Sequence, residues 1–150
     1  MKKVWTYLLN KELSSEILDD ILSKGQTFVA NWKAHEMPLD ATFEIYKNRI
    51  IIVKVDESKY NASGCSIDKL LALIKSFEQE FNIELLNRLL VAYNNSENIA
   101  VVSSSQVKEK LESGEMTADT MIFDLSVSTS EALKDWQRPL KETWLKKYLN

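Results

Sequence analysis

The sequence predicts an α+β domain in which two amphipathic helices cover one face of an antiparallel sheet. Apolar residues recur at helical spacing in two long segments, and strand-like stretches stand before, between and after them. The resulting order is βαββαβ with one additional strand, and βαββαβ is the split βαβ or ferredoxin-like arrangement. We therefore expect residues 1–102 to form a ferredoxin-like core. Residues 103–150 are expected to be a C-terminal extension, with further helix and strand segments, that packs on this core as part of one structural unit.

The first strand is predicted at residues 4–9, and the first helix at residues 14–34. Ser14 is a favourable N-cap residue for this helix, which should end before Pro38. Gly25 lies on the apolar stripe of the helix, where a glycine costs ~1 kcal/mol relative to alanine. We therefore expect the helix to approach the sheet closely at Gly25. The stripe consists of Ile17, Leu18, Ile21, Leu22, Gly25, Phe28, Val29 and Trp32.

A β-hairpin is predicted next. Residues 41–46 alternate between apolar and polar side chains, and residues 49–55 are apolar on both faces, as in a central strand. Lys47 and Asn48 stand where a two-residue turn belongs, and asparagine tolerates positive φ. Phe43, Ile45 and Val53 should share one core with residues of both helices. The helical members of that core are Ile17, Ile21, Phe28, Leu70, Ile74 and Phe77.

The second helix is predicted at residues 67–81, followed by strands at residues 89–93 and 99–102. In the extension, Ser103 and Gln106 form a capping box that opens a short helix, and Gly114 should close it. A further strand is expected at residues 120–125. A second capping box at residues 128–131 precedes a last helical segment. Trp136 and Trp144 in that segment are expected to be anchors between the extension and the core, or interface residues.

Composition excludes several classes of protein. The chain is 45% hydrophobic and 27% charged, which is ordinary for a soluble globular protein. A net charge of −3 argues against a nucleic-acid-binding surface, which needs clustered Lys and Arg. The apolar runs are too short to span a membrane, and no signal peptide is recognisable. One cysteine cannot form an internal disulfide, which favours a reducing compartment. Together, these observations lead us to expect a cytoplasmic protein that contacts neither nucleic acid nor membrane.

Several segments of the chain resemble a family of short bacterial proteins of uncharacterised activity, sometimes labelled "ABC transporter ATPase". The segments are Trp32-Lys33-Ala34-His35, Phe43-Glu44-Ile45, Val55-Asp56-Glu57, residues 62–69, and Trp136, Pro139, Leu140 and Trp144. The resemblance covers nearly the whole chain, and its most specific part is Ser63-Gly64-Cys65-Ser66-Ile67-Asp68-Lys69. It implies a bacterial protein but supplies no mechanism.

The ATPase label conflicts with the sequence. A P-loop needs Gly-x-x-x-x-Gly-Lys-Ser/Thr, because backbone N–H groups must wrap the phosphates while the lysine reaches them. The three glycines of the chain, Gly25, Gly64 and Gly114, lie far apart, and none opens such a motif. The protein is therefore not expected to be a P-loop ATPase.

The best candidate site is the segment that leads into the second helix. Ser63 or Ser66 can cap this helix, which places Cys65 within the first turn, where unpaired N–H groups and the positive end of the helix dipole favour an anion. Gly64 would permit close backbone approach. The candidate ligand-binding residues are Ser63, Gly64, Cys65, Ser66, Asp68, Lys69 and Asp56.

Three interpretations of Cys65 remain open from the sequence. It is a buried packing residue, part of a pocket for a small anion or a partner's acidic group, or a catalytic thiol. A catalytic thiol generally needs a base, and His35 is the only histidine in the chain. The leading hypothesis is a binding or interaction protein that could form a homodimer, and the alternative is an enzyme with Cys65 as nucleophile and His35 as base. One His and one Cys cannot build a structural zinc site, so no metal or cofactor is expected.

Overall fold

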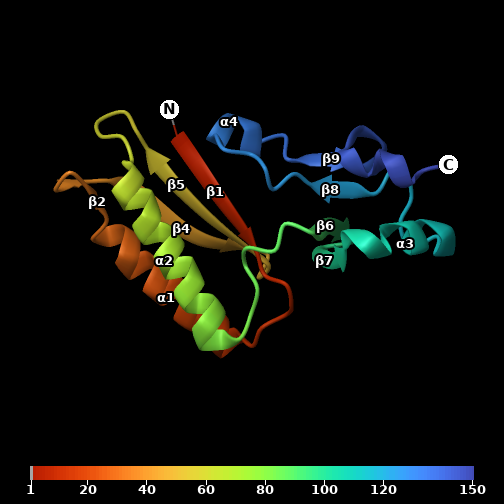
Figure 1. Cartoon of the computed structure of the whole chain (residues 1–150), viewed down its shortest axis with the longest axis horizontal. Helices are drawn as coiled ribbons and strands as arrows, with labels where there is room; N and C mark the ends of the chain where they lie inside the picture. The colour runs from red at the N-terminus through yellow and green to blue at the C-terminus, as the bar shows by residue number, and fades with distance from the viewer. Residues whose placement is uncertain (1) are drawn as a thin grey trace.

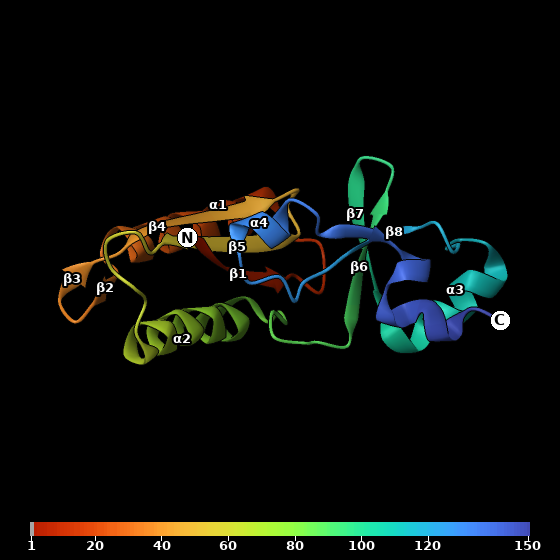
Figure 2. The same cartoon turned by 90° about the horizontal axis from the view of Figure 1, so that it is seen from above.

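The computed structural model describes residues 2–150 and contains two antiparallel sheets, which confirms the mixed α+β class (Figure 1). The first sheet has the order β1–β5–β4 and consists of β1 (Lys2–Leu8), β4 (Asp40–Tyr46) and β5 (Ile50–Asp56). The second has the order β7–β6–β8–β9 and consists of β6 (Leu90–Asn95), β7 (Asn98–Ser103), β8 (Met121–Phe123) and β9 (Gln137–Pro139). Figure 2 shows the second sheet and α3 beyond one end of the first sheet.

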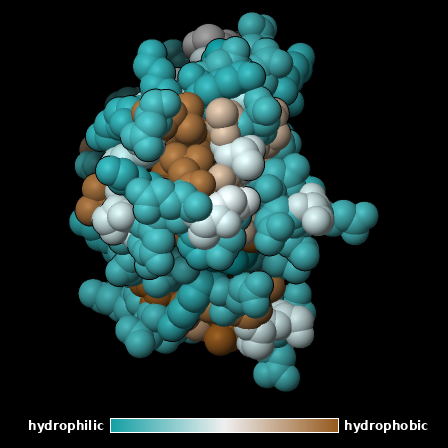
Figure 3. All heavy atoms as spheres, turned by 90° about the vertical axis from the view of Figure 1, so that its right-hand side faces the viewer, coloured by the Kyte–Doolittle hydropathy of each residue, from teal (hydrophilic) through white to brown (hydrophobic). Residues whose placement is uncertain are grey.

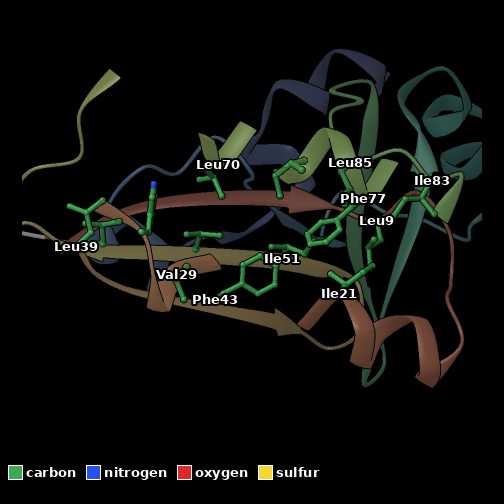
Figure 4. Close-up of a cluster of buried hydrophobic side chains, with 14 of the residues drawn as sticks. Leu9, Ile21, Val29, Leu39, Phe43, Ile51, Leu70, Phe77, Ile83 and Leu85 are labelled. Carbon is green, nitrogen blue, oxygen red and sulfur yellow. The ribbon is translucent and has the colours of Figure 1, made fainter. Parts of the chain in front are cut away.

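Two long helices, α1 (Ser15–Ala30) and α2 (Gly64–Phe81), pack on one face of the first sheet. Phe43 and Ile51 of the sheet, Ile21 of α1 and Phe77 of α2 belong to a single buried cluster (Figure 4). An ion pair of 2.7 Å between Lys24 Nζ and Glu80 Oε2 joins the two helices at the surface. All nine residues predicted to share a core lie in this cluster, so that prediction is confirmed.

Gly25 approaches the sheet as closely as the sequence predicts. A Cβ atom placed on Gly25 would lie 2.3 Å from the ring of Phe43, which is far inside van der Waals contact. The absence of a side chain therefore lets the aromatic ring of β4 lie directly against the backbone of α1.

The opposite face of the first sheet is covered in part by the second half of the chain. Val4, Leu8, Ile50 and Ile52 form a cluster there with Ala92, Ile99, Phe123 and Trp136. The ring of Trp136 lies 5.3 Å from Tyr46 and 4.9 Å from Phe123, centroid to centroid. Trp136 is therefore an anchor between the extension and the core, as predicted. Trp144 is not packed in this way, because 54% of its surface is exposed.

The strand order differs from the ferredoxin-like expectation. The first split βαβ unit is present, since β5 lies between β1 and β4. The second unit would place the next strand, β6, on the free edge of β1. Instead, β6 pairs with β7 and β8, and three consecutive residues of β6 (Val91, Ala92, Tyr93) are buried, as in a central strand with both faces covered.

The free edge of β1 is occupied by a segment from the extension. Val4 N–H donates to the Ser128 carbonyl over 2.9 Å, Lys3 forms a bridge with Thr129, and the Thr6 hydroxyl donates to the Leu125 carbonyl. The expected boundary at residue 102 falls inside the second sheet. β6 lies before this residue, β7 contains it, and β8 and β9 follow it.

The first helix is shorter than predicted. It ends at Ala30, and the following residues form a small hairpin of β2 (Lys33–Ala34) and β3 (Met37–Pro38). The turn of this hairpin is made by His35 and Glu36, with φ of 50° and 67°. Trp32 still packs in the core, which explains why it continued the apolar stripe in the sequence.

The extension follows the predictions in part. Ser103 caps a 3₁₀ turn, η1 (Ser104–Gln106), that leads into α3 (Val107–Ser113), and Gly114 closes this helix with φ of 82°. Thr129 caps α4 (Ser130–Leu133). The expected last helix is wrong, because β9 comes first and is followed by two 3₁₀ turns, η2 (Leu140–Glu142) and η3 (Trp144–Tyr148). Among residues 2–150, no helix is long and apolar enough to cross a membrane.

Candidate functional site

The predicted site at the start of α2 is built around a capping box. Ser63 is the N-cap residue, and its hydroxyl oxygen accepts the N–H of Ser66 over 3.2 Å. The Ser66 hydroxyl in turn accepts the N–H of Ser63 over 2.7 Å and donates to the Ser63 carbonyl. Both predicted hydroxyls therefore serve the helix start itself, and an anion here would rely on the N–H groups of Gly64 and Cys65.

Cys65 is exposed, so the interpretation of it as a buried packing residue is wrong. Asp68 and Lys69 are also exposed, and Ser66 is buried. A Cβ on Gly64 would meet open space, and Gly64 does not have positive φ. Neither close backbone approach nor a special conformation therefore explains this glycine.

The loop before α2 is held by Glu57 rather than by Asp56. Glu57 Oε2 accepts the N–H of Ala62 over 2.9 Å, one residue before the N-cap. Asp56 instead accepts the N–H of Ser58, and this hydrogen bond lowers the pKa of the Asp56 carboxyl. The predicted carboxylate is thus engaged in its own turn.

The hairpin that carries His35 is tied to the start of α2. The indole N–H of Trp32 donates to the Ser66 carbonyl over 2.9 Å. This bond brings the neighbourhood of His35 to the same end of the sheet as Cys65. His35 and Cys65 are both exposed, and no hydrogen bond joins the two within residues 2–150.

A cavity of about 540 Å³ lies elsewhere, at the junction of the two sheets. Its walls come from β1, the connection between α2 and β6 with the start of β6, β8 with the residues that follow it, Arg138 of β9, and residues 142–144. The three hydrophobic clusters of the molecule meet here, since Leu85 belongs to the first, Leu8 to the second and Val91 to the third. The lining residues are Thr6, Tyr7, Leu8, Leu85, Leu86, Asn87, Arg88, Leu90, Val91, Ile122, Phe123, Asp124, Leu125, Ser126, Arg138, Glu142, Thr143 and Trp144.

The wall between α2 and β6 is fixed by hydrogen bonds. Glu78 Oε2 accepts the N–H of Leu85 over 2.8 Å and the N–H of Leu86 over 3.2 Å. The side chain of Asn10 accepts the N–H of Glu84 over 2.8 Å. The cavity is therefore bounded by a connection whose backbone is held from two other elements, which favours a pre-formed site.

The lining of the cavity contains both positively and negatively charged side chains. Arg88 and Arg138 contribute positive charge, and Asp124 and Glu142 contribute negative charge. Burial raises the pKa of Tyr7 to about 12, although the nearby charge of Arg88 opposes this shift. The phenol of Tyr7 is therefore neutral at physiological pH and remains a hydrogen-bond donor.

The sequence interpretation missed this cavity. Its residues come from five separate stretches of the chain, and no short motif connects them. Leu86 and Trp144 of the lining are large apolar residues that the structure leaves exposed, and the sequence pattern does not distinguish them from buried ones. A smaller cavity of about 310 Å³ lies between α3 and residues 148–150. Figure 3 shows that end of the molecule as mostly hydrophilic, with a strip of hydrophobic atoms between polar ones.

Within residues 2–150, no group of three His, Cys, Asp or Glu side chains is placed to hold a metal ion. Comparisons of the chain with protein-family models, with curated proteins and with solved structures gave no match.

Proposed function

We propose that the protein is a non-catalytic binding protein whose ligand occupies the cavity between the two sheets. The observation that carries this proposal is the cavity itself. Its volume of about 540 Å³ falls in the ~300–1,000 Å³ range that is usual for small-molecule sites. Its interior combines buried apolar side chains with a few polar groups, which is the usual composition of such sites.

The apolar part of the cavity comes from core residues. Leu8, Val91 and Phe123 are each only 4% exposed, so the fold positions them rigidly. The polar part includes Tyr7, Asn87, the two arginines and the two acidic residues. This division favours a ligand with an apolar body and at least one polar group.

Two leucines of one connection allow a controlled test. Leu86 lines the cavity and is 37% exposed, whereas Leu89 is 66% exposed and does not line it. We expect a Leu86→Trp change to block the cavity entrance without disturbing the core, and a Leu89→Trp change to leave it open. The measurement is thermal stabilisation of the two variants and the unaltered chain by a library of small apolar and amphipathic compounds.

Compounds that stabilise the unaltered chain and Leu89→Trp, but not Leu86→Trp, would support the proposal. Equal stabilisation of both variants would place the ligand elsewhere. A library without any stabilising compound would contradict a binding role for the cavity.

The start of α2 supports a second candidate, because Cys65 presents an exposed thiol in the first turn of a helix. In this alternative, Cys65 acts as nucleophile and His35 as base, or the turn binds a small anion. A reactive thiol should be alkylated by iodoacetamide faster than the thiol of a short unstructured peptide at neutral pH. Alkylation at the peptide's rate, together with no effect of phosphate on melting temperature, would contradict this candidate.

A further inference from the structure

Arginine is rare in this chain, and two of its positions coincide with the cavity. The sequence contains 19 basic residues, of which only Arg49, Arg88 and Arg138 are arginine. Arg88 and Arg138 line the cavity, whereas no lysine among residues 2–150 does so. Arginine differs from lysine in presenting a planar fork of N–H donors that matches a carboxylate in two parallel hydrogen bonds.

The two guanidinium groups are available to a ligand. Arg88 belongs to the connection between α2 and β6, and Arg138 belongs to β9, so they enter from different walls. Both residues are exposed, and neither forms an ion pair with any carboxylate of residues 2–150.

Neither acidic residue of the lining forms an ion pair with the arginines. Asp124 Oδ1 accepts the N–H of Ser126 over 2.9 Å and the Ser126 hydroxyl over 2.5 Å, so this carboxylate closes a turn. Glu142 is exposed in η2 and makes no ion pair with either arginine. Within residues 2–150, both guanidinium groups therefore keep their N–H donors free of ion pairs, although the two carboxylates share the lining with them.

The remaining lining suits an apolar body. Leu85, Ile122 and Phe123 form a buried apolar surface, while Leu86 and Trp144 are exposed at the opening. A planar ring beside Trp144 would gain stacking and apolar contact that a hydrated inorganic anion cannot. Tyr7 adds a neutral hydroxyl donor.

We infer that the ligand of this cavity is an organic anion, with its carboxylate bound by the guanidinium groups of Arg88 and Arg138 and its apolar or aromatic body held against the buried surface. This inference rests on the proposed function, because it names the class of ligand for the same cavity. Inorganic anions lack the apolar body, and neutral or cationic analogues lack the group that the arginines bind.

Three probes with the same ring system test the charge requirement: naphthaleneacetate, naphthaleneacetamide and naphthaleneethylamine. Acetate serves as the anion without an apolar body. Dissociation constants are measured by calorimetry for the unaltered chain and for Arg88→Gln, Arg138→Gln, Arg88→Lys and Arg138→Lys. Lys146→Gln is the matched control, since it removes one exposed positive charge near Trp144 from a residue outside the lining.

We expect naphthaleneacetate to bind at least about tenfold more tightly than the amide, because a hydrogen bond to a charged group contributes ~1.5–3 kcal/mol. Each Arg→Gln change should weaken the acid about tenfold without altering the affinity of the amide. The Arg→Lys variants should recover only part of the loss, because lysine keeps the charge but not the fork. Lys146→Gln should bind as the unaltered chain does.

Equal binding of the acid and the amide would overturn the inference while leaving the cavity as a binding site. Tighter binding of the amine, or a full effect of Lys146→Gln, would overturn it as well. Absence of naphthaleneacetate binding also contradicts the inference, and the library result with the Leu86 and Leu89 variants then decides separately whether the cavity binds any ligand. Melting temperatures of the four arginine variants, all altered at exposed positions, verify that each is folded.

Discussion

Gly25 shows how one missing side chain fixes the distance between a helix and a sheet. Alanine is the better helix former by ~1 kcal/mol, yet its Cβ would overlap the ring of Phe43. Overpacking of this kind typically costs ~1–3 kcal/mol, which exceeds the gain in helix propensity. The steric conflict therefore outweighs the local preference at this position.

We expect Gly25→Ala to lower the free energy of unfolding by about 1–2 kcal/mol, measured by urea denaturation. Gly64→Ala is the matched control, because its Cβ would meet open space in the first turn of α2. The control should be as stable as the unaltered chain or slightly more so. If Gly25→Ala matched the control, the close approach of α1 to Phe43 would be contradicted.

Tyr7 gives a prediction about pH. Burial raises the pKa of its phenol from 10.0 to about 12, so folding favours the protonated form. This contribution to stability is fully present below the pKa of the unfolded chain, and it is lost as pH rises through the folded value. In an ultraviolet titration, the chain should show a tyrosine ionisation near pH 12 that Tyr7→Phe removes. A titration curve that Tyr7→Phe leaves unchanged in this range would contradict the burial of the phenol.

At the scale of elements, the sequence correctly predicted the turns and helix starts at which the local residue pattern agrees with the tertiary packing. The turn at Lys47 and Asn48 has φ of 47° and 62°, and the capping residues Ser14, Ser63 and Ser103 all lie at helix starts. The hairpin at His35 was missed because its turn contains no glycine and because Trp32 continues the helical stripe. In that hairpin, tertiary contacts outweigh the local pattern.

The second sheet could not be deduced for a different reason. Periodicity shows that a strand has a buried face, but it does not show which strand lies beside it. The pairing of β6 depends on β8, whose single paired position, Ile122 opposite Tyr93, lies far away in sequence. The cavity depends on that pairing, so it was also outside the reach of local patterns.

The hydrogen bond between Trp32 and Ser66 connects the β2–β3 hairpin to the first turn of α2. We expect Trp32→Phe to lower the free energy of unfolding by about 1–2 kcal/mol, because the hydrogen bond from the buried indole N–H to the Ser66 carbonyl is lost. Amide hydrogens in the first turn of α2 should then exchange faster with solvent. Trp144→Phe, at an exposed position, should change neither quantity. An unchanged exchange rate in Trp32→Phe would show that the bond does not hold the helix start.

At the scale of the whole molecule, the two halves of the chain bury apolar side chains against each other. The face of the first sheet opposite the helices carries Val4, Leu8, Ile50 and Ile52, and residues after position 103 cover it through Phe123 and Trp136. The extension therefore buries part of the apolar surface of the first sheet.

Removal of residues 104–150 should expose this apolar face together with the edge of β1. We expect the shortened chain to aggregate or to melt at a lower temperature than the full chain, because large exposed apolar patches promote association. Light scattering and thermal denaturation under identical conditions measure both effects. A shortened chain that is monomeric and equally stable would contradict the assignment of the extension to the same structural unit.

The contact between β1 and residues 125–129 has a consequence for synthesis. Thr6 and Leu125 are 119 positions apart, so β1 leaves the ribosome long before the segment that covers its edge. At ~5–20 residues per second, that interval is on the order of ten seconds. During this time, an unpaired strand edge is open to other nascent chains. Chaperone protection early in translation would therefore matter more for this protein than for one whose first strand pairs only with its sequence neighbours.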